Sequence, residues 1–278
     1  MELNHSTGAI AFLLATPLVT GLTVGIAPSS AAIIAGSAAA VSINNFSHKP
    51  KETDTVTNTY TPTIANSRSV ISETTADKVF LSNSHELLPA NLSHSRVQGD
   101  GNNYSGLAQI EAAVIGDFAI NAEETFSFNF QTVLDLLISV DDRQSERGST
   151  SGTISLSLIN TVTNILLDSF QLTSDLDSYR GLSWNFSATD SFNPTPINFN
   201  SMTEGSAVQS LLSTSGVYSR TFDSATNLRL VEVKNNIAEA EAEAVPEPST
   251  LLGTATVLGL FARRRKLNNK LSQVTSKV

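Results

Sequence analysis

The segment that decides the fold is residues 126–140, FSFNFQTVLDLLISV. Seven of its eight even-numbered positions are apolar, and most of the odd-numbered positions between them are polar. Successive side chains of a β-strand point to opposite faces of its sheet. An alternation of this length therefore predicts a long strand with one buried face.

The segments around it repeat the same pattern. After a polar, charged and glycine-containing stretch at residues 141–152, apolar side chains alternate again at Ile154, Leu156 and Leu158. This order predicts a hairpin whose two long strands pair antiparallel. A short helix is considered only at residues 207–212. Further strands are expected at residues 107–120, 166–172, 182–188, 217–222 and 227–233.

Alternating strands separated by polar turns are typical of all-β proteins. We expect an antiparallel β-sandwich over residues 96–240, with a jelly-roll-like arrangement as one form it can take. Residues 41–95 are rich in Ser, Thr, Asn and Pro and predict a spacer, with weak strands at 70–71 and 79–81. Residues 237–244 alternate Ala with Glu, as an edge strand or an acidic tether can. We favour a strand that continues as a tether.

The composition excludes several classes of function. Charged residues make up 15% of the chain, hydrophobic residues make up 40%, and the net charge is -9. An acidic chain does not neutralise phosphates, so nucleic-acid binding is not expected. The chain has no Cys, which excludes disulfides, thiolate metal sites and Cys nucleophiles.

Residues 1–40 predict an export signal. Residues 6–48 contain no Asp, Glu, Lys or Arg, and most of residues 9–43 is apolar or small. Because no Lys or Arg precedes the apolar stretch, an uncleaved membrane anchor is the alternative. Small residues stand at the spacing that signal peptidases accept in two places, Ser30 with Ala32 and Ala38 with Ala40.

The other end of the sequence combines three features in order. Pro246, Glu247 and Pro248 form an extended, accessible segment, because each proline restricts its own backbone and that of the residue before it. An apolar run able to enter a bilayer follows, with the large side chains Leu251, Leu252, Val257, Leu258, Leu260 and Phe261. A basic cluster then predicts a stop-transfer signal on the cytoplasmic side, formed by Arg263, Arg264, Arg265 and Lys266.

The apolar run is short for a membrane span. As a helix, residues 249–262 would extend about 21 Å, against a hydrocarbon core of about 30 Å. Snorkelling arginines and local thinning of the bilayer close part of this gap. Residues 267–278 are then predicted to be a basic cytoplasmic end.

Together these features resemble the PEP-CTERM sorting tail of exported bacterial proteins, over residues 245–266. The resemblance implies that an exosortase-type membrane protease recognises Pro246, Glu247 and Pro248 and removes the tail. It also implies export across the cytoplasmic membrane to the cell surface or extracellular matrix, with a transient membrane anchor. An association with exopolysaccharide is part of the same implication.

Few residues of the predicted domain suggest chemistry. Thr150 stands where a nucleophile elbow has Ser, and we interpret residues 148–152 as a flexible loop. His85 and His94 are too far apart to predict a zinc site, and no cofactor is expected. Acidic residues gather in three predicted loops without an EF-hand pattern, and we interpret them as solvated loops rather than calcium sites: Asp141, Asp142 and Glu146; Asp175 and Asp177; Asp100 with Asn102 and Asn103.

One aromatic pair admits two interpretations. Leu182, Trp184 and Phe186 share one face of a predicted strand. We favour a place in the core for them. A sugar-stacking platform on a carbohydrate-binding module is the alternative.

Three classes of function remain open. We place first a non-enzymatic surface or matrix protein delivered by the sorting tail. A carbohydrate-binding module is second. A secreted hydrolase is third, and it requires two carboxylates about 5–10 Å apart in a cleft.

Overall fold

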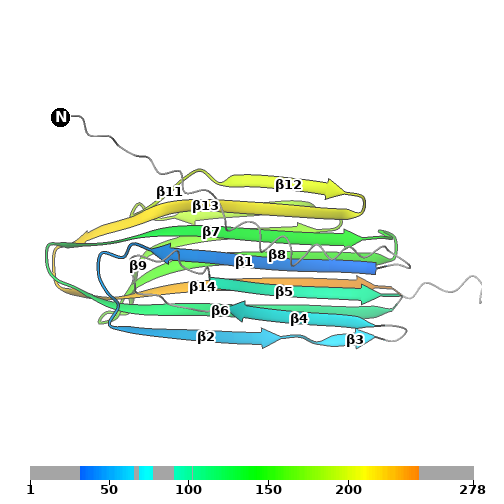
Figure 1. Cartoon of the computed structure of the whole chain (residues 1–278), viewed down its shortest axis with the longest axis horizontal. Coiled ribbons are helices and arrows are strands. Elements are labelled where there is room, and N and C mark those ends of the chain that lie inside the picture. Colours follow the sequence, from blue (N-terminus) through cyan, green and yellow to red (C-terminus); the bar gives the residue numbers. More distant parts are fainter. Residues whose placement is uncertain (1–31, 66–68, 78–90, 102, 244–278) are drawn as a thin grey trace, which may run out of the picture. The chain divides into compact units, whose positions relative to one another are not determined.

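The computed structural model describes residues 32–65, 69–77, 91–101 and 103–243. These residues form fourteen strands, which pair into two antiparallel sheets. The sheets pack face to face, so the predicted all-β sandwich is confirmed (Figure 1). No helix in these ranges has the length and apolar character needed to cross a bilayer.

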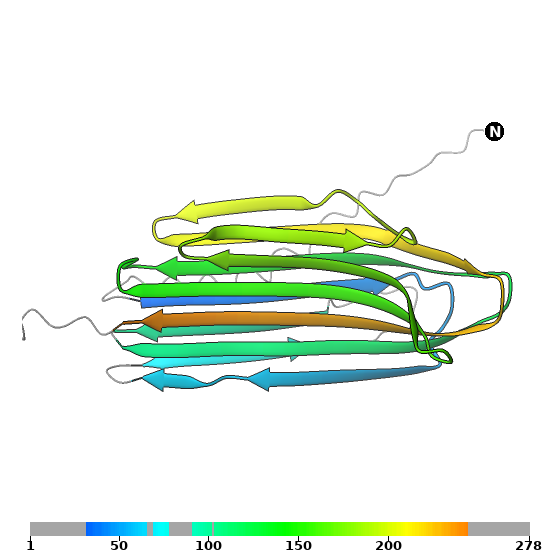
Figure 2. The same cartoon turned by 180° about the vertical axis from the view of Figure 1, so that it is seen from behind.

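Each sheet contains seven strands. Sheet A runs in the order β11 (Phe192–Pro194), β13 (Ala207–Phe222), β7 (Glu124–Val140), β1 (Ala32–Asn44), β5 (Asn91–Asp100) and β4 (Val70–Asp77), and β12 (Asn198–Glu204) also pairs with β13. Sheet B runs in the order β10 (Gly181–Ala188), β9 (Ile165–Asp177), β8 (Glu146–Asn160), β14 (Thr226–Ala242), β6 (Tyr104–Ile120) and β2 (Glu52–Tyr60), and β3 (Thr63–Ala65) also pairs with β6. Figure 2 shows sheet B from its outer side, with β14 in orange between β8 and β6.

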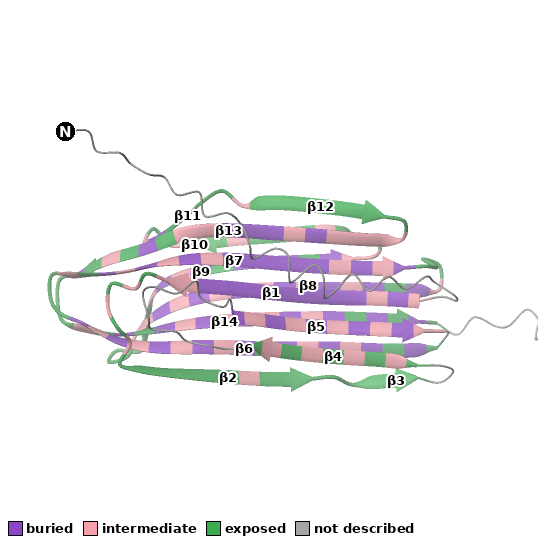
Figure 3. Ribbon diagram, in the orientation of Figure 1, coloured by how far each residue is buried: buried purple, intermediate pink, exposed green. Residues whose placement is uncertain are grey.

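The core lies between the alternating faces of the two sheets. The even-numbered residues of β7 from 126 to 140 are all buried, as the sequence pattern predicts (Figure 3). Phe128 stacks on Tyr218 of β13 with ring centroids 5.0 Å apart, and Phe130 meets Phe170 of β9 edge-on, also at 5.0 Å. A second apolar cluster fills another part of the interior. Its members include Ile33, Leu136, Ile138, Val140, Ala238 and Ala240.

The predicted hairpin at residues 126–162 is wrong. β7 pairs with β1 and β13 in sheet A, whereas β8 pairs with β14 and β9 in sheet B. Residues 141–145 therefore cross from one sheet to the other. Both strands turn their even-numbered side chains inward, and two apolar faces bury each other best across a sandwich.

The predicted loop at residues 148–152 is also wrong, because these residues lie inside β8. Its small residues fit where the sheets approach closely. A Cβ on Gly152 would lie 2.8 Å from Leu134 of β7, and one on Gly148 would lie 3.0 Å from Ile138. Thr150 faces inward and donates a hydrogen bond from its Oγ1 to the carbonyl oxygen of Ile237 at 3.1 Å.

The N-terminal part of the sandwich was not predicted. The proposed spacer at residues 41–95 contains the end of β1, the strands β2, β3 and β4, and the start of β5. The predicted strand at 70–71 is part of β4, and that at 79–81 lies outside the described residues. The sandwich therefore spans residues 32–242 rather than 96–240. The predicted signal boundary at residue 40 cuts through β1, which pairs with β5 and β7 and is buried on both faces over residues 35–42.

Two further predictions concern the C-terminal half. Residues 207–212 are strand, not helix, because they pair with β7 along their whole length. Residues 237–242 are strand as expected, with buried Ala238, Ala240 and Ala242 and exposed Glu239 and Glu241. This segment lies in the middle of sheet B, however, and not at an edge.

A buried carboxylate joins the two sheets at the aromatic cluster. Asp168 of β9 is 4% exposed. It accepts hydrogen bonds from the Tyr218 hydroxyl at 2.9 Å, the Arg220 guanidinium at 2.8 Å and the Thr189 hydroxyl at 2.9 Å. Burial alone would raise the pKa of Asp168, but these donors outweigh it and hold the pKa below the usual value.

We expect Asp168→Ala to lower the free energy of unfolding by about 3 kcal/mol, because it leaves Arg220 and the Tyr218 hydroxyl without their acceptor. The depressed pKa means that the stabilisation from Asp168 is present above the ordinary aspartate range and is lost as the pH falls through the folded-state pKa. Urea unfolding at several pH values should therefore show the gap between wild type and Asp168→Asn closing as the solution is acidified. Asp175→Asn, on the exposed face of the same strand, is the control. A gap that stays constant with pH would contradict the role given to Asp168.

Candidate functional site

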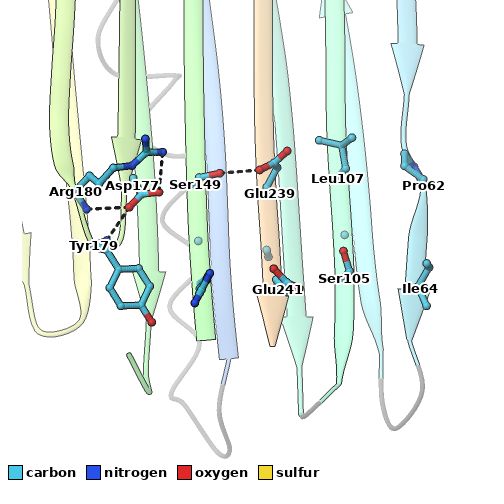
Figure 4. Close-up of a pocket in the computed structure, with 14 residues that line it drawn as sticks. Pro62, Ile64, Ser105, Leu107, Ser149, Asp177, Tyr179, Arg180, Glu239 and Glu241 are labelled. Carbon is cyan, nitrogen blue, oxygen red and sulfur yellow. Dashed lines mark hydrogen bonds and ion pairs between the residues drawn. The ribbon is translucent and has the colours of Figure 1, made fainter. Parts of the chain in front are cut away.

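The described residues form a groove on the outer face of sheet B. Its volume is about 810 Å³. Strand pairing builds it from residues far apart in the sequence. Two rows of aligned residues cross the strands. The first row runs across β3, β6, β14 and β8 and consists of Ile64, Ser105, Glu241 and Arg147. The next row runs across β6, β14, β8 and β9 and consists of Leu107, Glu239, Ser149 and Asp177. Figure 4 shows the labelled side chains of these two rows projecting from the same face of the sheet.

The groove has an apolar side and a polar side. The apolar side is formed by Leu107 on β6 and by two residues of the segment that pairs with β6, Pro62 and Ile64. Glu239 and Glu241 stand beside it on β14, and the Ser149 hydroxyl donates a hydrogen bond to Glu239 at 3.0 Å. Hydrogen-bonding groups therefore line a partly apolar surface, an arrangement that suits polar small molecules.

The turn after β9 closes the groove and is held in place by Asp177. The backbone N–H groups of Tyr179 and Arg180 each donate to the Asp177 carboxylate at 2.9 Å, and the Arg180 guanidinium lies 3.4 Å from it. Burial raises the pKa of Asp177. The donors from Tyr179 and Arg180 together lower this pKa by more than burial raises it, so it lies below the usual value. The carboxylate therefore stays charged and orders the turn.

Tyr179 presents an aromatic ring at this end of the groove. Its hydroxyl donates to the carbonyl oxygen of Arg143 at 2.5 Å. The guanidinium of Arg147 lies 5.5 Å from the ring centroid, within the range of a cation–π interaction. The ring is thereby fixed, although its residue is more than half exposed.

The groove contains two carboxylates that come from one strand. Glu239 and Glu241 are two residues apart on one face of β14, which separates their Cβ atoms by about 7 Å. That separation is within the range that hydrolases use. Carboxylates of glycosidases flank the bond that is cleaved, whereas these two project side by side from a single strand (Figure 4).

The predicted place of Trp184 in the core is wrong. Trp184 is 47% exposed because β10 is the edge strand of sheet B. Phe186, on the same strand face, does pack against the core, with its ring 5.5 Å from that of Phe170. The two rings therefore do not form one exposed platform, and Trp184 does not line the groove.

The acidic loops are turns held by their own hydrogen bonds. Asp142 accepts from the Gln144 N–H at 3.0 Å and the Ser145 hydroxyl at 2.6 Å, and Glu146 is buried and accepts from the Asp142 N–H. Asp175 is exposed on β9. Over the described ranges, no three His, Asp or Glu side chains gather as a metal ion requires. His94 lies on the outer side of β5, and His85 and Asn102 are outside the described residues.

Sequence reasoning missed the groove. The outward direction of Glu239 and Glu241 was expected from the alternation of residues 237–244. Their neighbours Arg147, Ile64 and Leu107 come from three other strands, and no local pattern shows which strands pair. The sequence predicts a solvated loop at Asp177, with no sign that it borders a groove, and no pattern singles out Tyr179.

The second candidate site is the C-terminal segment, which lies outside the described residues. A family model of the PEP-CTERM protein-sorting motif matches residues 244–266. This range contains every residue predicted for the sorting tripeptide, the apolar run and the basic cluster. No curated protein and no solved structure matches the chain. The chain therefore carries a PEP-CTERM sorting motif that begins two residues after the last strand of its sandwich.

Proposed function

We propose that the chain is a non-enzymatic protein of the cell surface or extracellular matrix, exported across the cytoplasmic membrane and sorted by an exosortase-type protease. The observation that supports this is the sorting motif at residues 244–266. On this route the apolar run enters the membrane transiently, the basic cluster stays on the cytoplasmic side, and the sandwich lies outside. An association with exopolysaccharide belongs to the same proposal.

The order of strands fits such a route. β14 is the last of the strands that the structure describes, yet it lies between β8 and β6. Until residues 226–242 are in place, β8 and β6 each expose an unpaired edge, and unpaired edges recruit other chains. A tail that holds the C-terminal end at the membrane gives β14 time to insert before release.

Removal of the tail is the direct test of this proposal. In a bacterium with an exosortase-type protease, we expect the mature wild-type protein to lack residues 263–278 and the Pro246→Ala variant to retain them, because the extended recognition segment is altered. Mass spectrometry of the C-terminal peptide decides this, with Glu243→Gln as a control just outside the motif. A mature wild-type protein that keeps residues 263–278 would overturn the proposal.

The position of β1 supports one of the two predicted signal-peptidase sites over the other. Cleavage after Ala32 removes only the first residue of β1, whereas cleavage after Ala40 removes buried Ile33, Ala35 and Ala39. We therefore expect the mature chain to begin at Ile33, which N-terminal sequencing can check. A mature N-terminus at Val41 would show that the sandwich folds without most of β1 and contradict the pairing described above.

The groove supports a second candidate function, a carbohydrate-binding module. Sugars offer hydroxyl groups to carboxylates and a C–H face to apolar side chains, and the groove has both. Calorimetric titration of the full chain with a soluble neutral glucan should show binding that Glu241→Ala and Arg147→Ala each weaken at least about tenfold, since a lost hydrogen bond to a charged group costs about 1.5–3 kcal/mol.

Glu111→Ala is the matched control, because Glu111 lies on the same outer face of sheet B but not in the groove. No binding by the wild type would remove this second candidate and leave export untouched. Release of reducing ends would instead indicate a hydrolase and contradict the non-enzymatic assignment.

A further inference from the structure

Three polar side chains occupy the inward face of β14 where apolar residues are expected. Glu232, Lys234 and Asn236 are at most 1% exposed. They separate Leu228 and Leu230, in the aromatic cluster, from Ala238 and Ala240, in the second cluster. A fully buried lysine is rare, because removing its charge from water is costly.

One carboxylate contacts two nitrogens of different chemistry. An oxygen of Glu232 is in hydrogen-bond contact with the amine of Lys234. The other oxygen accepts from the side-chain amide of Asn91, on β5 of the facing sheet, at 3.0 Å. An amine and a carboxamide are thus held against the same acid in an interior that is closed to solvent.

Lys234 and Asn91 come from facing sheets and contact the two oxygens of one carboxylate, that of Glu232. Asn236 contacts the Ser93 hydroxyl, and the Ser95 hydroxyl donates to the carbonyl oxygen of Asn236 at 2.9 Å. Asn91 contacts Glu232, four residues before Asn236. Residue numbers therefore increase in the same direction along β5 and β14 where the two strands face each other. Lys234 lies between Glu232 and Asn236 on the inward face of β14, and these two residues contact β5 at Asn91 and at Ser93 and Ser95.

We propose that Lys234 and Asn91 condense to an intramolecular isopeptide bond, with Glu232 as the catalytic proton carrier. Glu232 takes a proton from the Lys234 ammonium, which leaves a neutral amine. The Nζ atom attacks Cγ of Asn91, the new C–N bond forms, and the bond from Cγ to Nδ2 breaks. Glu232 relays the proton from Nζ to the leaving nitrogen, and one ammonia is released.

The local environment favours this step over a permanent ion pair. Burial raises the pKa of Glu232, with Lys234 and Asn91 opposing, so the protonated form of the acid that the reaction needs is accessible. The reaction replaces two buried charges by a neutral amide and a neutral acid. Reacting groups fixed in one place gain a large effective concentration, and the absence of water excludes competing hydrolysis.

Asn236 is less suited to be the partner of Lys234. Its side-chain oxygen accepts from the Ser37 hydroxyl at 2.9 Å, and its amide contacts Ser93. No described contact joins it to Glu232, which would have to carry the proton. It instead fixes the alignment of β14 with β1 and β5.

The bond would tie together the two sheets of a chain that has no Cys. β14 ends two residues before the sorting motif, so any pull on the C-terminal segment reaches β14 first. An isopeptide bond from β14 to β5 passes that pull to sheet A through a covalent link. The inference does not depend on the proposed export route.

Tryptic mapping of the full chain tests the proposal. Without the bond, trypsin releases residues 230–234 as a free peptide ending at Lys234. With it, this peptide is missing, and a branched species joins residues 79–96 to the segment that begins at Leu230, lighter by one ammonia, about 17 Da, than the two parts together. Fragmentation of the branched species locates the bond at Lys234 and Asn91.

Variants separate the roles of the three residues. Lys234→Met and Asn91→Ala should abolish the branched species, and Glu232→Gln, which keeps the shape but cannot carry the proton, should reduce its yield at least tenfold. Asn236→Ala should retain it. Wild-type protein that yields free peptide 230–234 in full amount would overturn the proposal, whatever the variants do, and so would undiminished branching in Glu232→Gln.

Discussion

The fold depends on the burial of one apolar strand face against another across the gap between the sheets. Each long strand has apolar side chains at alternate positions, and no strand pair can bury that face within its own sheet. The chain therefore crosses repeatedly between sheets. β5, β6, β7 and β8 follow one another in the sequence, and each connection changes sheet. Eight of the twelve pairings between the described strands join strands that are not consecutive in the sequence, including all four pairings of β7 and β14, and a local hairpin was therefore the wrong expectation for residues 126–162.

The same constraint gives β14 its unusual composition. Its inward face is apolar near Leu228, polar at Glu232 to Asn236 and small near Ala238, and its outward face ends with Glu239 and Glu241. The polar section has partners on β5, so it fixes which part of β5 faces it. A one-residue shift would expose buried groups and bury the outward carboxylates. Paired buried polar groups add little net stability, and here they join β14 to one particular part of a strand in the facing sheet.

The sequence pattern predicted the faces of strands well and their partners poorly. The alternation at residues 126–140 and the Ala–Glu alternation at 237–242 correctly assigned the inward and outward side chains. Strands such as β2, whose residues are nearly all exposed, have no such pattern, and they were taken for a spacer. β1 was hidden for the opposite reason. Both its faces are buried, so its small residues do not alternate and resemble an export signal. Trp184 was misplaced because periodicity does not reveal which strand is an edge.

The two candidate sites differ in predictability for a physical reason. The sorting motif is one continuous segment whose features follow in order along the chain, so the sequence alone was enough to predict it. The groove and the buried triad of Asn91, Glu232 and Lys234 exist only after strands pair and sheets pack, and their members lie up to 179 positions apart, from Pro62 to Glu241. Sites of this kind can function only when the whole sandwich has folded. β14 contributes residues to the groove and to the buried triad, and it is the last described strand to be synthesised. The groove and the triad therefore cannot form until β14 has been made and has inserted between β8 and β6.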